Sequence, residues 1–307
     1  MLPYISPKAL FSISSDEIIN SSFIKKQKKQ FLAEFELNGV AEISLNGVSF
    51  DKSGIIAFLD GMEDPQEIIF HQFIDTHPAL LAFLESGDLE IFNQNHQAEL
   101  STEKGFSKTM KSKVAPYYCY RYNEVLSKAL KQRNWETLTL VCQSKPLIGI
   151  DHYSFCYQDA YQYLQLQVEN LEEMAARIKK GKSPGSEVQD VCDELVISSL
   201  NTLPDHFEGI RNAYGMALED LATSVFNEHK RARLTKLILR QGLKLTLNQD
   251  TKGRLTHVLN QLLKIEPDDE FIPEIEEKIT KSIKKVKVWH IALAGIVLMK
   301  IVWMILS

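Results

Sequence analysis

The chain has 307 residues, of which 44% are hydrophobic and 24% are charged, and its formal net charge is −5. This composition is typical of a globular protein with a real core, and the length is sufficient for two modest domains. Residues 1–270 carry 29 basic and 37 acidic side chains, a net charge of −8. Because nucleic-acid binding depends mainly on neutralising phosphates, this acidic balance speaks against a nucleic-acid partner.

The cysteines and the N-terminus indicate a reducing, cytoplasmic setting. Met1 to Pro7 lacks a basic stretch, and Ala9 to Ile13 is too short for the apolar part of a signal peptide, so we expect the N-terminus to stay in the cytoplasm. The cysteines are widely spaced, with no CxxC pair and no histidine at metal-ligand spacing. We predict free thiols, no zinc site and no cofactor. The four cysteines are Cys119, Cys142, Cys156 and Cys192.

The first 97 residues predict a small α+β domain. An amphipathic helix is expected over residues 18–35. Residues 42–50 alternate apolar and polar side chains around Asn46-Gly47, which predicts a β-hairpin because Asn-Gly favours a type I′ turn. Three short helices follow, each with a capping residue or an early proline. They are expected from Asp51 or Ser53 to Met62, from Asp64-Pro65 onward, and from Thr76-His77-Pro78 through Leu84.

Two histidines of this region, His71 and His77, lie near Glu67 and Asp75, an arrangement that suggests a metal or acid–base site as an alternative. A spacing of six residues does not place both histidines on one helix face. We therefore expect surface or capping roles for them.

Composition divides the chain into five segments. Residues 99–114 are polar, contain four lysines and lack apolar periodicity, as a linker does. Pro267 and Pro273 separate the helical body from the tail. The predicted segments are a small α+β domain (1–97), a polar linker (98–115), a helical domain (116–266), a basic juxtamembrane stalk helix (267–287) and a membrane anchor (288–306).

The sequence after Pro116 predicts a mainly α fold, as a helical bundle or an irregular α-solenoid. Residues 122–142 are typical of two antiparallel helices that are broken at Arg133-Asn134, and a long helix is expected over residues 152–179. No fixed repeat period is present, so both architectures stay open. Four further helices are expected over residues 187–200, 205–228, 231–247 and 252–265.

Three tyrosines, Tyr153, Tyr157 and Tyr161, follow one another four residues apart on the long predicted helix. A stripe of this kind is typical of a peptide-binding groove, and it is the candidate partner surface of this sequence. The alternative, which we favour, is that these rings belong to the core and their hydroxyls reach the surface.

The C-terminus predicts a transmembrane helix. Residues 288–306 are apolar over a length close to the roughly 20 residues that cross a bilayer, and Val288-Trp289 and Trp303 lie near the two ends. Lysines crowd the N-terminal flank, which places that side in the cytoplasm and attracts anionic lipid. We therefore expect a single-pass, tail-anchored protein; the alternative is an apolar helix packed on the body. The flanking lysines are Lys278, Lys281, Lys284, Lys285 and Lys287.

Lys300 lies inside this apolar segment, about three quarters of the way through. A lysine at the centre of a membrane helix costs roughly 2.5–3.5 kcal/mol on insertion. We expect its long side chain to extend toward the far headgroups. The alternative is that Lys300 pairs with an acidic intramembrane residue of a partner protein.

The sequence carries no recognised catalytic signature. Lys182-Ser183 after Gly181 does not form a phosphate loop, because that motif needs glycine where Ala176 stands. We expect a non-enzymatic, membrane-tethered helical interaction or scaffold protein that recruits an unknown cytoplasmic protein partner. Two alternatives stay open: a membrane-active effector or toxin, and a hydrolase of unrecognised type.

Overall fold

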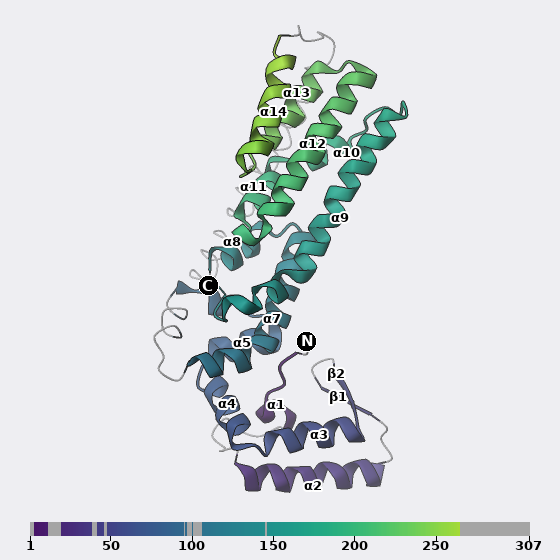
Figure 1. Ribbon diagram of the computed structural model, residues 1–307. Helices are drawn as coiled ribbons and strands as arrows, with labels where there is room; N and C mark the ends of the chain where they lie inside the picture. Colours follow the sequence, from purple (N-terminus) through teal and green to yellow (C-terminus); the bar gives the residue numbers. More distant parts are fainter. Residues whose placement is uncertain are drawn as a thin grey trace, which may run out of the picture.

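The computed structural model describes residues 3–11, 20–38, 42–45, 48–94, 96, 100, 106–144 and 146–264. Within these residues the fold is mainly helical, as predicted, with one two-stranded sheet. The helices extend the molecule in one direction, from α2 at one end to α13 and α14 at the other (Figure 1).

The N-terminal region holds short elements around a hairpin. In chain order they are α1 (Pro7–Phe11), α2 (Ser21–Asn38), β1 (Glu42–Leu45), β2 (Val48–Asp51), α3 (Lys52–Met62), α4 (Pro65–Asp75), α5 (Pro78–Ser86) and the 3₁₀ turn η1 (Leu89–Phe92). The strands pair antiparallel, with Glu42 opposite Asp51, which confirms the predicted hairpin. Its Asn46-Gly47 turn lies outside the described residues.

Side-chain caps explain where the short helices begin. The Asp51 carboxylate accepts a hydrogen bond from the Gly54 amide at the start of α3 (2.6 Å), and the Asp64 carboxylate accepts one from the Gln66 amide at the start of α4 (2.9 Å). Each cap satisfies an amide that has no partner within the helix. These two predicted helices and α5 are therefore confirmed.

The longer helices form the rest of the described chain. They are α7 (Lys108–Lys131), α8 (Trp135–Gln143), α9 (Tyr153–Lys179), α10 (Glu187–Val191), α11 (Glu194–Thr202), α12 (Glu208–His229), α13 (Ala232–Gly242) and α14 (Gln249–Leu262), with the 3₁₀ turns η2 (Ile150–His152) and η3 (Asp205–Phe207). The break between α7 and α8 and the long α9 are both as predicted.

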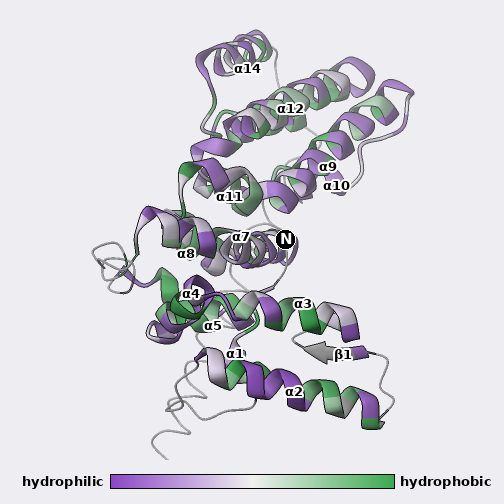
Figure 2. Ribbon diagram, turned by 60° about the horizontal axis from the view of Figure 1, so that its bottom comes forward, coloured by the Kyte–Doolittle hydropathy of each residue, from purple (hydrophilic) through white to green (hydrophobic). Residues whose placement is uncertain are grey.

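α9 and α12 lie side by side (Figure 1), and α7 packs along α9 with contacts that advance in the same direction, from Cys119 against Cys156 to Asn123 against Asp159. Between α9 and α12, contacts advance together along both chains, from Tyr157 against Phe207 to Lys179 against Asp220. α8, α11 and α13 run back between them and pack against one another in a second layer. α14 closes this stack against α12 and α13 (Figure 2).

α7 begins about two turns before the predicted start at Pro116. Ser107 Oγ accepts a hydrogen bond from the Met110 amide (3.3 Å) and caps the helix, which continues through Pro116 without a break. The assignment of residues 108–114 to a linker is therefore wrong. Met110 and Val114 are the only large apolar side chains in these first two turns, so the helical periodicity is hard to see.

Two other predicted helices are shorter in the structure. Residues 187–200 are divided into α10 and α11, because the Asp193 carboxylate accepts a hydrogen bond from the Leu195 amide (2.7 Å) and starts a new helix. The helix predicted over residues 231–247 ends at Gly242. Residues after it turn toward Asn248, whose side chain caps α14 by accepting from the Thr251 amide (2.9 Å).

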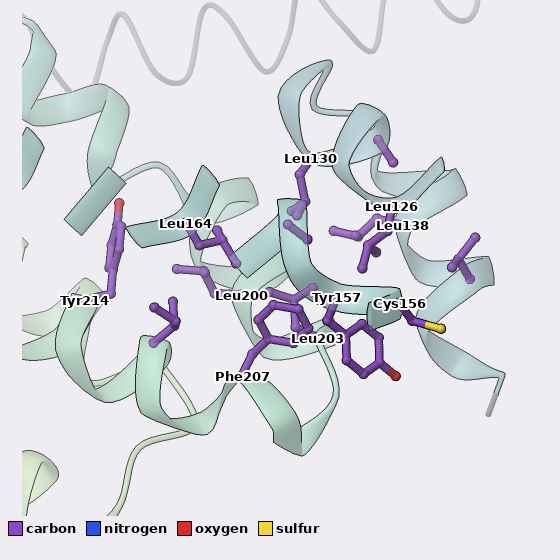
Figure 3. Packing of buried hydrophobic residues seen from close by; sticks show 14 of the residues in the cluster. Leu126, Leu130, Leu138, Cys156, Tyr157, Leu164, Leu200, Leu203, Phe207 and Tyr214 are labelled. Carbon is purple, nitrogen blue, oxygen red and sulfur yellow. The ribbon is translucent and has the colours of Figure 1, made fainter. Parts of the chain in front are cut away.

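One cluster of buried side chains extends through the stack, from Phe70 in α4 to Leu262 in α14. Figure 3 shows part of it, where Tyr157 and Leu164 of α9 lie with Leu200 and Phe207. This cluster contains residues on both sides of the predicted linker, so α4 and α5 share a core with α7. A second, smaller cluster lies around the N-terminal elements and consists of Ile5, Leu10, Phe11, Ile24, Leu59 and Met62.

The two histidines of the N-terminal region lie in different settings. His71 is buried, and its Nδ1 lies 2.8 Å from the Tyr4 hydroxyl. The predicted surface or capping role is wrong for His71, because the N-terminal segment covers it. His77 precedes α5, but it makes no side-chain cap, and its Nδ1 bonds the Phe73 carbonyl instead (2.7 Å).

Arg211 is a buried charge in α12, with only 3% of its surface exposed. Its guanidinium donates hydrogen bonds to the carbonyls of Leu203 (2.9 Å), Pro204 (3.2 Å) and Thr246 (3.3 Å). Arg211 thereby ties the loop before α12 to the loop between α13 and α14. Hydrogen bonds to a charged donor compensate for the burial of that donor.

Among the described residues, no helix combines the length and apolar character that crossing a bilayer requires. The predicted anchor at residues 288–306, with Lys300, lies outside the described residues, and so do the flanking lysines from Lys278 to Lys287.

Candidate partner-binding surface

The three tyrosines of α9 do not share one surface. Tyr157 is buried, and its ring meets Tyr122 of α7 edge to face at 5.8 Å and Phe207 at 5.2 Å. Figure 3 shows Tyr157 beside Phe207. Tyr153 is partly buried, whereas Tyr161 is 37% exposed. Tyr157 is therefore a core residue and not available to a partner, as the favoured interpretation expected, whereas the exposed Tyr161 does not fit that interpretation.

The exposed side of α9 carries different residues. Leu166, with 56% of its surface exposed, lies on this side together with the exposed carboxylates of Glu169, Glu172 and Glu173. An apolar side chain beside acidic ones at helical spacing is typical of a surface that receives an amphipathic segment. The sequence shows this pattern, but it does not show which helices lie beside it.

Of these α9 residues, Glu172 lies beside α12 and α14, and side chains of the three helices line a shallow groove of about 520 Å³. Met216 contributes an apolar side chain that is 43% exposed. The groove is lined by Glu172, Met216, Ala217, Glu219, Asp220, Thr223 and Arg254. We call it the acidic groove.

Ion pairs fix most charges of the acidic groove. Arg254 Nε lies 3.1 Å from Glu219 Oε2, and Lys179 Nζ lies 2.8 Å from Asp220 Oδ1. Among the residues that the structure describes, Glu172 has no ion-pair partner and stays open to an incoming cation. Because these groups are near the surface, their attraction for a ligand weakens at high salt.

The buried titratable groups offer no comparable site. Burial lowers the pKa of His71 to about 4, with a smaller contribution from the nearby positive charge of Lys113. Burial also raises the pKa values of Tyr118, Tyr122 and Tyr157. These groups are neutral members of the core. Nor does the described part of the chain gather three or more His, Cys, Asp or Glu side chains in a position to hold a metal ion.

No family model matches the chain, and no curated protein or solved structure matches it significantly. The acidic groove must therefore be interpreted from its own chemistry.

Proposed function

We propose that the chain is a non-enzymatic helical scaffold, tethered to the cytoplasmic face of a membrane by its C-terminal segment, which recruits a protein partner through the acidic groove. The partner segment carries basic side chains beside apolar ones. The observation that carries this proposal is the position of the unpaired Glu172 next to the exposed Met216 in a groove between three helices.

The arrangement of the helices supports an irregular α-solenoid as the finer description of the body. Parallel helices in one layer and returning helices in the other are the pattern by which solenoids stack their helix pairs. Such stacks bind partners along extended surfaces made by successive helices. The acidic groove lies between helices of consecutive pairs, α9 and α12, where binding of this kind takes place.

The charge of the groove supports a basic partner. Glu172 lines the groove, is exposed and makes no ion pair among the described residues, and the exposed Glu169 and Glu173 lie near it on α9, outside the groove. An incoming lysine or arginine brings charge complementarity, which raises association rates and sets orientation. The exposed Met216 supplies apolar surface that a partner can remove from water.

Membrane attachment rests on the sequence of residues 288–306 and is tested separately. Cells expressing the full chain, or a version that ends at residue 264, are fractionated, and the membranes are washed with alkaline carbonate. We expect only the full chain to resist extraction. If both versions are extracted, the tethering part of the proposal is wrong.

The groove is tested in the full chain by proximity labelling in cells, with Glu172→Lys and Met216→Glu as variants. We expect both variants to lose the same labelled neighbours while their membrane fraction stays unchanged. Glu228→Lys, an exposed change further along α12 and outside the groove, is the matched control and retains them. Identical labelling by all four chains contradicts a role for the groove.

A further inference from the structure

Two of the four cysteines meet inside the helical stack. Cys119 in α7 and Cys156 in α9 are 37 residues apart in the sequence, yet their sulfur atoms lie 3.5 Å apart. Cys119 is 1% exposed and Cys156 is fully buried. Cys156 lies next to Tyr157 in α9, in the part of the core that Figure 3 shows. The pair therefore lies at the junction of two parallel helices.

The other two cysteines differ from this pair. Cys142 and Cys192 have no second sulfur within bonding distance in the described chain, and burial raises the pKa of each thiol to about 12. Cys119 has a pKa below its ordinary value, because the Cys156 thiol donates a hydrogen bond to its sulfur. Since a thiolate is the nucleophile in thiol oxidation, Cys119 is the more reactive member.

We propose that Cys119 and Cys156 form a redox-sensitive pair, which a peroxide converts into a disulfide that joins α7 to α9. This inference does not depend on the proposed scaffold function. The bonded sulfur separation is about 2.05 Å, so the sulfurs have to approach by about 1.5 Å from their positions in the structure. The free thiols of the structure are the reduced form of the pair.

The chemistry uses one molecule of hydrogen peroxide. The Cys119 thiolate attacks one peroxide oxygen, the O–O bond breaks, and the thiolate becomes a sulfenic acid while the other oxygen leaves as water after taking up a proton. Cys156 sulfur then attacks the sulfenic sulfur, the S–OH bond breaks, and the thiol proton leaves with the hydroxyl as a second water. Two thiols are oxidised by two electrons, and the peroxide is reduced to two waters.

The alternative is that the two sulfurs are only small apolar groups in contact, as buried cysteines often are. Peroxide has to reach the core through local opening under both interpretations, so even a redox pair reacts slowly. They differ in the product. A redox pair yields one specific disulfide, whereas inert core thiols yield unmodified cysteines.

The product is identified on the full chain, purified in detergent and treated with hydrogen peroxide for a series of times. The protein is then unfolded in guanidinium chloride so that every free thiol reacts with N-ethylmaleimide, and the unreduced protein is digested and analysed by mass spectrometry. We expect a peptide pair linked through Cys119 and Cys156 that lacks two hydrogen atoms, with the maleimide on Cys142 and Cys192. Dithiothreitol before blocking abolishes the link. Four blocked thiols after peroxide, a sulfinic acid at Cys119 or a link through another cysteine overturns the proposal.

Thermal unfolding gives a second readout. A cross-link across 37 residues restricts the unfolded chain, so we expect peroxide to raise the unfolding midpoint of the full chain by about 5–10 °C. Each variant is compared with itself before and after oxidation. Cys142→Ser and Cys192→Ser retain the increase, and Cys119→Ser and Cys156→Ser lose it. An increase that persists in Cys119→Ser, or no increase in the unaltered chain, overturns the proposal.

Discussion

The N-terminal elements and the helical stack differ in how their helices are held. α1, α2 and α3 share the small cluster of six buried residues, and surface ion pairs such as that of Lys28 with Asp60 join α2 to α3. In the stack, α9 and α12 share many more buried aromatic and aliphatic side chains of the large cluster, beside the exposed ion pair of Lys179 with Asp220. Since exposed ion pairs contribute little, stability is concentrated in the stack.

The two regions meet through a few specific contacts. Tyr4 reaches His71 in α4, and Lys8 of α1 lies 3.1 Å from Asp75 at the end of the same helix. α4 in turn belongs to the large cluster through Phe70. We therefore expect the N-terminal elements to open locally while the stack stays folded.

The largest effect is expected from Phe207→Ala in the stack. Phe207 is fully buried against Tyr157 and Tyr161, and its removal leaves a cavity between α9 and α12. We expect the free energy of unfolding of the full chain to fall by about 3–5 kcal/mol, measured by urea denaturation followed by circular dichroism. A loss below about 1 kcal/mol contradicts the central role of this junction.

Leu59→Ala in α3 tests the stability of the N-terminal elements. Leu59 is fully buried in the small cluster, and its truncation should cost about 2–4 kcal/mol of local stability. We expect hydrogen exchange to speed up in α2 and α3 and to stay unchanged in α9 and α12. Equal acceleration in all four helices would show that the two regions unfold as one unit.

Acid should weaken the contact between the regions. The pKa of His71 is lowered by burial to about 4, against about 6.5 in an unfolded chain. The unfolded state therefore binds more protons between these values, and stability that is complete above pH 6.5 is lost as the pH falls toward 4. Between pH 7 and 5 we expect a loss of about 2 kcal/mol from this group, measured by urea denaturation at each pH.

His71→Asn is the control for the acid effect, because its amide oxygen can still accept the Tyr4 hydrogen bond and does not titrate. We expect the variant to lose most of this pH dependence. A pH dependence equal to that of the unaltered chain would assign the effect to other groups.

The smallest effect is expected from Asp220→Asn. The Asp220 pair with Lys179 joins α9 to α12, but both side chains are about half exposed. We expect a change in unfolding free energy of no more than about 0.5 kcal/mol, and less at high salt. A loss near 2 kcal/mol would mean that ion pairs, in addition to the core, hold the stack together.

Helix starts could be predicted from the sequence where a single local signal decides them. Asp51 and Asp64 each precede a helix and cap it as expected, and the predicted break at Arg133-Asn134 is the place where the Asn134 side chain caps α8. The start of α7 could not be predicted, because Ser107 precedes a polar stretch and Pro116 gave a stronger but misleading signal. The anchor and the lysines before it stay a prediction.

The acidic groove and the cysteine pair could not be predicted from the sequence, because each brings together residues that are far apart in the chain. The acidic groove joins Glu172 in α9 to Arg254 in α14, more than 80 residues later. The cysteine pair joins residues 37 apart. Periodicity shows which side of a helix is apolar, but it does not show which other helix meets that side. Tyr157 and Tyr161 illustrate the point, since the same regular spacing predicted their helix, yet one is buried and the other is 37% exposed.

Arg211 controls how α13 and α14 assemble against α12. Its three carbonyl acceptors come from loops on both sides of α12, and they converge only when α13 and α14 are in their final positions. If α13 were shifted by one turn along α12, the guanidinium would be buried with part of its acceptors missing, which is costly. Apolar side chains alone would tolerate such a shift more readily. A single arginine therefore selects one register among several that the hydrophobic surfaces would otherwise permit.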